Sequence, residues 1–299
     1  MPYTRVIVKQ LLPPIILTLR RKLLQFAFTL RQKLSQHSPH HVPSSKMKDL
    51  YYDHIGRNKH CTFNEICLRN DLTLKIHPAS RSGFEYFCYA PEMVEELDSF
   101  IHLSQGRLNF LDIGAYHGIF SLVFTKNVKD RRAVAIDSSP LAFSRLLYNM
   151  HKNAECNITA LECAMSKEPG NLTMFYDEWE HTISAPTVRS SDRSILVETK
   201  TGDILCSELN FIPDIIKIDV EGHEVKVLKG LHGILGRYNP LVFLEVHPSG
   251  IAREGDRISD ILEFVHKNGY HVCLTDARKL SAEELQKLQS ITRLILVPS

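Results

Sequence analysis

The sequence predicts an α/β protein in which a mostly parallel, doubly wound sheet carries helices on both faces. Short apolar runs rich in Val, Ile, Leu or Phe are typical of fully buried strands. Helical patterns separate many of these runs, and such an alternation forms a parallel sheet. The runs lie at 108–113, 133–137, 158–164, 215–220, 241–246, 270–275 and 294–298, and the helical patterns at 118–129, 140–153, 222–236 and 256–268.

Two further segments complete this outline. The run PEMVEELDSFIHL (91–103) predicts a helix that leads into the core. The stretch 171–212 breaks the alternation, and its segments NLTMFYD and SILVETK predict strands added between the third and fourth core strands. Trp179 in this stretch could stack on a sugar ring or simply cover the core.

The first 48 residues differ in charge from the rest of the chain. They hold nine Lys or Arg and no acidic residue, whereas the remainder holds 27 basic and 34 acidic residues. Apolar residues recur from Ile16 to Leu34 at steps of three and four, which predicts an N-terminal amphipathic helix. Through residues 1–35 this helix could contact a membrane surface, pack on the body or a second subunit, or stay disordered. We expect a basic arm and linker at 1–48 and a single domain at 49–299, with its core at about 84–298.

A membrane span and a secreted, disulfide-bonded fold are both disfavoured. The apolar run Leu11–Leu19 is interrupted by Pro13 and is far shorter than the roughly 20 residues of a span. The seven cysteines are scattered without a C-x-x-C pair, which is typical of buried thiols in a reducing compartment. We expect a cytoplasmic protein whose arm could lie on the cytoplasmic membrane face.

The strongest local signal is the turn FLDIGAYHG, where a predicted strand runs through a D-x-G-x-x-x-G pattern into a helix. Gly114 allows the tight turn, and Gly118 allows the start of the helix to approach a ligand closely. Tyr116 breaks the G-x-G-x-x-G fingerprint of dinucleotide enzymes, and no G-K-[ST] follows as in a phosphate loop. The turn indicates a cofactor pocket of another kind.

A carboxylate follows the second predicted strand. Asp137 ends the run AVAID, where it could accept hydrogen bonds from ribose hydroxyls. It could also cap the next helix, which opens with Ser138, Ser139 and Pro140. Both interpretations remain open from the sequence.

Ionisable residues gather at the carboxyl edge of the predicted sheet. The run IIKIDVEGHE delivers Asp219, Glu221 and His223 to this edge, and LVFLEVHP brings Glu245 and His247 to it. Ligands bind at this edge of open α/β sheets, and clustered charges are costly there unless they are paired or used. The cluster is therefore the candidate catalytic site.

Three segments resemble the FkbM family of methyltransferases: FLDIGAYHG, KIDVEGHEVKVLKG and LVFLEVHP. The run ALECAMSKEPGNLTMFYD also resembles the third strand of that family and the strand added after it. The similarity covers residues 84–298, and KIDVEG is its most specific part. It implies a Rossmann-like class I methyltransferase fold and S-adenosylmethionine as the methyl donor. It also implies transfer to a hydroxyl oxygen of a glycan, sugar or natural-product alcohol.

The resemblance also implies roles for individual residues. Asp112, Gly114 and Gly118 would line the methionine end of the cofactor. Asp137 would hold the ribose, although the family more often has Glu-Pro where this chain has Asp137-Ser138. Two residues after the third strand would flank the adenine: Ala164 and Met165. The residues expected to contact the cofactor are Asp112, Gly114, Ala115, Tyr116, Gly118, Asp137, Ser138, Ala164, Met165 and Asp219.

Methyl transfer to an alcohol needs a base, because an alcohol is a poor nucleophile until its proton is removed. His223 and Asp219 are the leading candidates, and Glu221 or Glu245 could orient or replace them. His223 could instead be a first-turn helix residue bonded to a neighbouring carboxylate. Asp219 and Glu245 could also hold a divalent cation, although the sequence fixes no full ligand set.

Other functions fit less well. The single-glycine turn disfavours a nucleotide-cofactor oxidoreductase, and a non-catalytic, membrane-associated binding protein would leave the edge carboxylates idle. A nucleic-acid methyltransferase would need a positive face on the catalytic body, which is acidic. The expected partner is therefore a small-molecule or glycan acceptor and not a nucleic acid, and the oligomeric state stays open.

Overall fold

The computed structural model describes residues 64–68, 72–154, 156–176, 183–184 and 194–299. The predicted arm at 1–48 and the surroundings of Trp179 lie outside these residues, so the membrane contact expected for residues 1–35 stays a prediction. Within the described ranges, no helix is long and apolar enough to cross a membrane.

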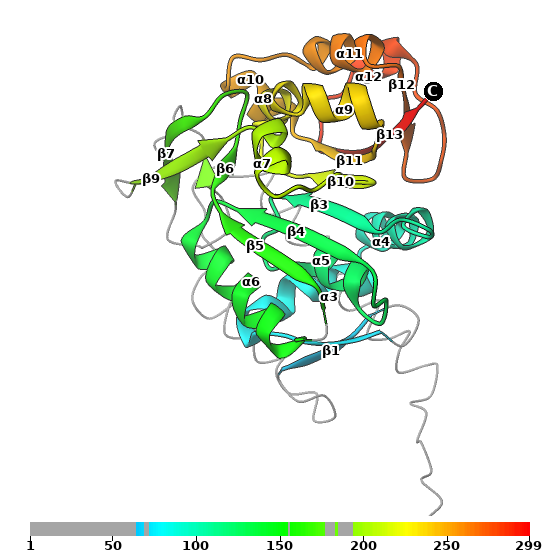
Figure 1. The fold of residues 1–299 in the computed structure, drawn as a ribbon. Coiled ribbons are helices and arrows are strands. Elements are labelled where there is room, and N and C mark those ends of the chain that lie inside the picture. The colour runs from blue at the N-terminus through cyan, green and yellow to red at the C-terminus, as the bar shows by residue number, and fades with distance from the viewer. Residues whose placement is uncertain (1–63, 69–71, 155, 177–182, 185–193) are drawn as a thin grey trace, which may run out of the picture.

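A seven-stranded sheet forms the centre of the molecule (Figure 1). Its strand order is β12-β13-β11-β10-β3-β4-β5, and β13 runs antiparallel to the other six. The strands are β3 (Asn109–Ile113), β4 (Arg132–Asp137), β5 (Ile158–Glu162), β10 (Ile215–Ile218), β11 (Leu241–Val246), β12 (Tyr270–Leu274) and β13 (Thr292–Pro298). All seven lie where the sequence predicts strands, which confirms the mostly parallel α/β sheet.

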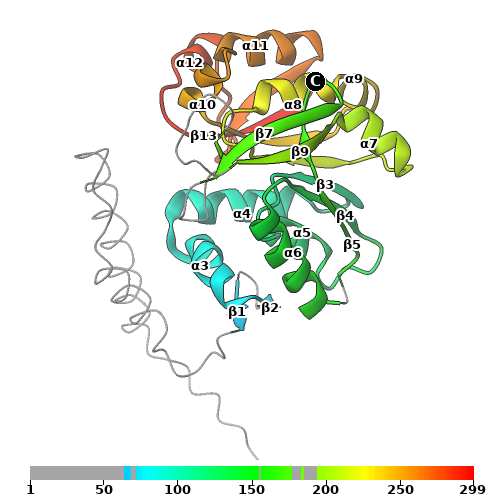
Figure 2. The same cartoon turned by 90° about the vertical axis from the view of Figure 1, so that its left-hand side faces the viewer.

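Helices cover both faces of this sheet (Figure 2). One face carries α3 (Arg81–Tyr89), α4 (Pro91–Leu103), α5 (Ile119–Thr125) and α6 (Pro140–Lys152). The other carries α7 (Gly202–Glu208), α8 (Glu224–Gly230), α9 (His232–Tyr238), α10 (Pro248–Arg253), α11 (Ile258–Lys267) and α12 (Ala282–Gln286). Because strand side chains alternate between faces, neighbouring residues of β3 pack on opposite faces of the sheet. Phe110 packs against the helices of the first face and Leu111 against those of the second. Burial on both faces explains why these strands read as continuous apolar runs.

The helical pattern at 222–236 is two helices in the structure. The break falls at Leu231, whose side chain occupies the space beside Gly202, where a Cβ would lie 2.1 Å from Leu231 Cδ2. The second helix then starts against the carboxylate of Asp203, which accepts hydrogen bonds from the N–H groups of Gly233 and Ile234, both at 2.8 Å. Periodicity cannot reveal such a break, because its cause lies in a distant helix.

A smaller sheet and an N-terminal hairpin complete the described fold. The smaller sheet has the order β6-β9-β7-β8 and contains the added strands predicted from the sequence, paired antiparallel as β7 and β9. Its strands are β6 (Ala164–Met165), β7 (Gly170–Tyr176), β8 (Ile183–Ser184) and β9 (Ser194–Lys200). The hairpin β1 (Glu65–Cys67) and β2 (Thr73–Lys75) leads through the 3-10 helix η2 (Pro78–Ser80) into α3.

Candidate functional site

The turn between β3 and α5 has a left-handed backbone at both predicted glycines. Gly114 has φ +79°, and a Cβ there would lie 1.8 Å from the carbonyl oxygen of Asp219. Gly118 has φ +85°, and a Cβ there would lie 2.4 Å from Leu146 Cδ1. Gly114 therefore lets β3 turn sharply against the end of β10, and Gly118 lets α5 begin against α6.

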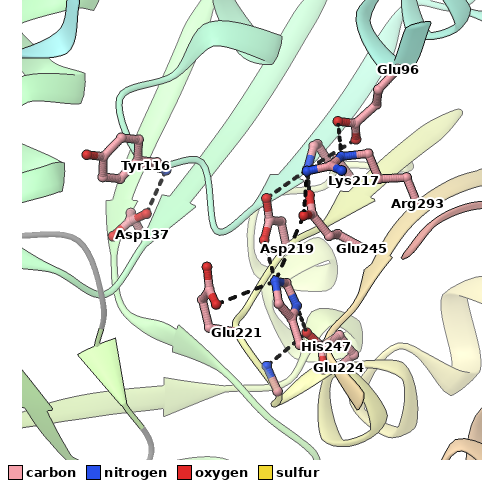
Figure 3. A network of polar contacts seen from close by, with 11 residues as sticks. Glu96, Tyr116, Asp137, Lys217, Asp219, Glu221, Glu224, Glu245, His247 and Arg293 are labelled. Carbon is pink, nitrogen blue, oxygen red and sulfur yellow. Dashed lines mark hydrogen bonds and ion pairs between the residues drawn. The ribbon is translucent and has the colours of Figure 1, made fainter. Parts of the chain in front are cut away.

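Asp137 ends β4 and braces this turn (Figure 3). Its Oδ2 accepts a hydrogen bond from the Tyr116 N–H at 2.6 Å, and its Oδ1 accepts one from the Ser139 N–H at 2.9 Å. Burial raises the pKa of Asp137 to about 7. The cap of α6 comes from Ser139, whose Oγ accepts the Ala142 N–H, so Asp137 is not the N-cap. Since each carboxylate oxygen has two acceptor sites, Asp137 can still receive a ligand hydroxyl.

Two larger residues at this edge have strained backbone conformations. Tyr116 has φ +51° and Glu221 has φ +56°. Such conformations cost on the order of 1–3 kcal/mol each and cluster at functional sites. The Tyr116 ring stacks on His117, with 3.6 Å between the ring centroids. The strain marks the turn after β3 and the turn after β10 as the two facing walls of the site.

The other residues expected at the cofactor lie around the same edge. Asp112, buried in β3, accepts a hydrogen bond from Ser121 Oγ at 2.7 Å, and burial raises its pKa to about 6. The N–H groups of Gly114 and Ala115 both donate to the carbonyl of Ile136 at 2.9 Å. Ser138 directly follows β4, and the residues expected at the adenine form the buried strand β6: Ala164 and Met165.

Asn149, on α6, holds the turn between β3 and α5 in place. Its Nδ2 donates to the carbonyl of His117 at 2.9 Å and to Ser80 Oγ at 3.2 Å. Its Oδ1 accepts the His77 N–H at 2.6 Å. A single buried amide thus ties the start of α5 to the N-terminal segment, which gives this residue a positioning role.

A buried ion-pair network begins at Lys217, in β10 (Figure 3). The ammonium lies 3.1 Å from Asp219 Oδ2, 3.5 Å from Glu96 Oε1 and 3.9 Å from Glu245 Oε2. Arg293, in β13, joins the same two glutamates at 3.0 Å to Glu96 and 2.7 Å to Glu245. Four elements of the fold thus contribute charges to one cluster at the carboxyl edge.

The carboxylates of this cluster differ in exposure. The side chains of Glu96 and Glu245 are 3% and 8% exposed, whereas those of Asp219 and Glu221 are 29% and 48% exposed. Asp219 and Glu221 lie on the side of the cluster that faces Tyr116 and Asp137 (Figure 3). Burial tends to raise the pKa of Asp219, but the charges of Lys217 and His247 outweigh it and lower this pKa. Burial raises the pKa of Glu221.

His247 lies at the centre of the carboxylates. Its Nδ1 lies 2.7 Å from Glu224 Oε1, and its Nε2 lies 3.4 Å from Glu221 Oε2 and 4.0 Å from Asp219 Oδ1. Burial alone would lower its pKa, but the hydrogen bond to Glu224 and the nearby charges raise it to about 9. The ring is therefore an imidazolium at neutral pH, and it adds a positive charge beside Asp219.

His223 is placed apart from this cluster. Its Nε2 lies 3.0 Å from Ser166 Oγ, and its Nδ1 lies 3.1 Å from Glu254 Oε2, which also pairs with Lys226. It is the N-cap residue of α8, one position before the first turn, and its carboxylate partner is Glu254 on α10's C-terminal side. The structure therefore brings together Asp219, Glu221, Glu245 and His247, and it gives both ring nitrogens of His223 other partners.

Three side chains offer atoms that could hold a metal ion. One atom each from Asp219, Glu245 and His247 lies within 4.8 Å of the others. The sequence indicated the two carboxylates, and the structure adds the imidazole. The ammonium of Lys217 already contacts both carboxylates, so a cation is built into this cluster.

The turn after β10 packs backbone to backbone on α10. Gly222 has φ +119°, and a Cβ there would lie 2.6 Å from the Cα of Gly250. A Cβ on Gly250 would lie 2.7 Å from the Cα of Gly222. This contact holds Glu221 and the start of α8 against the helix that follows His247.

Several members of the network escaped the sequence analysis. Lys217 could have been found, because it alternates with Asp219 along one strand and both reach the same side. Glu224 could have been found as well, because it belongs to the same run of ionisable residues and opens α8. Glu96 and Arg293 carry no local signal, since they meet across 197 positions of sequence.

Comparison with known proteins gives a consistent result. The model of the methyltransferase FkbM domain matches residues 112–272. "Methyltransferase 1" of Beauveria bassiana is 23% identical over 196 residues, covering 56% of this chain and 75% of that protein. The hexuronic acid methyltransferase AglP of Haloferax volcanii is 26% identical over 137 residues, covering 46% of this chain and 54% of that protein.

Among solved structures, the methyltransferase FkbM from Methylobacillus flagellatus superposes with a TM-score of 0.43 at 16% identity. The superposition covers 63% of this chain and 43% of that one. The chain thus spans less than half of that structure and about half of AglP.

Proposed function

This chain belongs to the FkbM family of methyltransferases, and we propose that it transfers the methyl group of S-adenosylmethionine to a hydroxyl oxygen of a sugar, glycan or related alcohol. The observation that carries the proposal is the carboxylate of Asp219. It is part-exposed, it borders the glycine turn after β3, and it is held between Lys217 and the His247 imidazolium.

The residues around the turn fit S-adenosylmethionine. The bound cofactor would supply an electrophilic methyl group on a positively charged sulfur. The acidic side chains of Asp112 and Asp219 suit that charge, and Asp137 retains acceptor sites for ribose hydroxyls. Gly114, Ala115 and Tyr116 would line the methionine side, while Ser138, Ala164 and Met165 would lie toward the adenine.

Asp219 would accept the hydroxyl proton during the transfer. The oxygen–carbon bond forms as the carbon–sulfur bond breaks, and the acceptor oxygen gains positive charge in the process. Its proton then becomes strongly acidic, so even a carboxylate with a lowered pKa is a sufficient base. Glu221 would accept hydrogen bonds from neighbouring hydroxyls of the acceptor.

The charges at this edge favour a neutral alcohol over a carboxylic acid as the acceptor. Among the described residues of the cluster, Lys217 and Arg293 are 3% and 14% exposed and already paired with glutamates. An acidic acceptor would face the carboxylates of Asp219 and Glu221, and like charges repel. In this respect the chain would differ from the hexuronic acid methyltransferase to which it is similar.

Labelled S-adenosylmethionine and a panel of neutral sugars paired with their uronic acids would test this proposal. We expect alkali-stable methyl ethers on neutral sugars, and we expect Asp219→Asn to lose transfer while still binding S-adenosylhomocysteine in calorimetry. Alkali-labile methyl esters would instead identify a carboxyl acceptor. Failure of the folded wild type to bind S-adenosylhomocysteine would favour a non-catalytic binding protein.

Membrane contact of the arm and a cytoplasmic location form a separate proposal. It is supported by the nine basic residues at 1–48 and the amphipathic pattern from Ile16 to Leu34. Flotation of the full chain with anionic vesicles tests it, with neutral vesicles as the control. Equal flotation with both vesicle types, or none with either, would contradict an electrostatic membrane anchor.

A further inference from the structure

We infer that Lys217 is the resident cation of this site and takes the place of a divalent metal ion, holding Asp219 in the orientation needed for proton removal. The inference rests on the proposed role of Asp219 as the base. Lys217 touches no acceptor, because its side chain is 3% exposed. It is therefore a positioning residue.

The charge balance of the network supports this assignment. Lys217 and Arg293 share two carboxylates, Glu96 and Glu245, so the buried part of the network is neutral when all four are ionised. A divalent ion among the atoms of Asp219, Glu245 and His247 would have to share both carboxylates with the Lys217 ammonium, which already lies 3.1 Å from Asp219 and 3.9 Å from Glu245. The repulsion between the ammonium and the ion would oppose such binding.

The surroundings of Lys217 fix its ammonium in one place. Its strand position pairs in register with Asp112 of β3 and Phe243 of β11, and its Nζ lies 4.8 Å from the centre of the Phe120 ring. The ammonium thereby contacts one oxygen of Asp219 at 3.1 Å, while the His247 Nε2 lies 4.0 Å from the other. The buried ammonium therefore holds one oxygen of the Asp219 carboxylate, and the His247 ring lies beside the other oxygen.

Metal dependence of the wild-type protein is the first test. We expect methyl transfer to be unchanged by about 10 mM EDTA, and we expect calorimetry to detect no Mn²⁺ binding at up to about 1 mM. Loss of transfer in EDTA that Mg²⁺ or Mn²⁺ restores would overturn the inference, as would stoichiometric Mn²⁺ binding that Asp219→Asn abolishes. A wild type that methylates no hydroxyl would instead refute the proposed function on which the inference rests.

A charge-balanced variant is the second test. Lys217→Met alone would leave buried carboxylates unpaired, so Lys217→Met is combined with Glu96→Gln to keep the interior neutral. We expect kcat to fall by at least about 100-fold, while KM and affinity for S-adenosylhomocysteine change by less than about threefold. Lys229→Met removes a lysine of α8 that lies outside the network, and it should leave all three unchanged. A folded double variant with wild-type kcat would overturn the inference, and the EDTA experiment decides if this variant does not fold.

Discussion

Two aspartates bracket strand β10, and they do different work. Asp214, at the amino end, accepts hydrogen bonds from the backbone N–H groups of Leu108 and Asn109, both at 2.8 Å. Asp219, at the carboxyl end, has charged side chains as partners: Lys217 at 3.1 Å and His247 at 4.0 Å. The backbone partners of Asp214 let it hold β10 and β3 together, whereas the ionic partners of Asp219 keep its carboxylate ionised.

The surfaces around the two aspartates differ in the same way. A shallow hollow lies at the amino edge, lined by residues that include Gly106, Arg107, Asp214 and Tyr238. Both charged side chains of this hollow bind backbone groups. Asp214 accepts hydrogen bonds from the N–H groups of Leu108 and Asn109, and Arg107 donates to the carbonyl of Leu103 at 2.5 Å. Ligands of parallel sheets bind at the carboxyl edge, so a hollow without a charge cluster is not the better candidate.

The largest expected effect contrasts two glycines with similar backbone angles. Gly114 at the carboxyl edge has φ +79° and no room for a Cβ, whereas Gly106 at the amino edge has φ +76° and nothing within 4 Å. Gly114→Ala should lower the free energy of unfolding by about 4 kcal/mol or more, or prevent folding. Gly106→Ala should cost only about 1 kcal/mol, because the left-handed backbone is its sole penalty. Denaturant unfolding measures both, and equal losses would contradict the close contact with Asp219.

The next effect separates catalysis from stability at the two ends of β10. Asp219→Asn should lower kcat by roughly 100- to 10,000-fold with little change in the free energy of unfolding. Asp214→Ala should keep kcat and lower that free energy by about 1–3 kcal/mol, because two backbone N–H groups lose their acceptor. Steady-state kinetics and urea unfolding of both variants provide the comparison. A loss of kcat in Asp214→Ala without a loss of stability would break it.

The pH dependence of cofactor binding should report Asp137. The ionised carboxylate accepts hydrogen bonds more strongly than the protonated acid, and burial raises its pKa to about 7. Affinity for S-adenosylhomocysteine should therefore rise by up to roughly tenfold between about pH 6 and pH 8 and then level off. Asp137→Asn should flatten this curve in calorimetry, while Asp214→Ala should retain it. A pH-independent affinity in the wild type would remove Asp137 from the ribose contact.

The smallest effect tests the two histidines near the turn after β10. His223→Gln should keep kcat within about fivefold and cost about 1 kcal/mol of stability, because Ser166 and Glu254 lose a bridging partner. His247→Gln should lower kcat by at least about tenfold, because Asp219 loses a neighbouring positive charge. Kinetics at saturating substrate distinguish them. A larger loss in His223→Gln than in His247→Gln would restore His223 as the candidate base.

The fold was predictable because its signals are local. Each core strand is an apolar run, and each predicted helix carries its own periodicity; the exception is the break at Leu231, whose cause lies at Gly202 in another helix. The turn after β3 was also predictable, because the glycine that permits its conformation, Gly114, stands within the turn itself.

The charge network was only half predictable. Side-chain types along β10 and β11 place acidic residues at one edge, but Glu96 and Arg293 reach it through tertiary packing across 197 positions. The separation of His223 from the carboxylates that surround His247 was also beyond the sequence. It depends on the turn at Glu221 and Gly222, where φ angles of +56° and +119° redirect the chain before α8.

The bare contact between Gly222 and Gly250 also bears on turnover. With backbone against backbone there is no side chain to yield, so the turn that carries Glu221 and helix α10 should move as one body. We therefore expect the spent cofactor to leave through motion of the opposite wall, around Tyr116. Release of product would then be slowed by stiffening the turn after β3, and not by changes in α10.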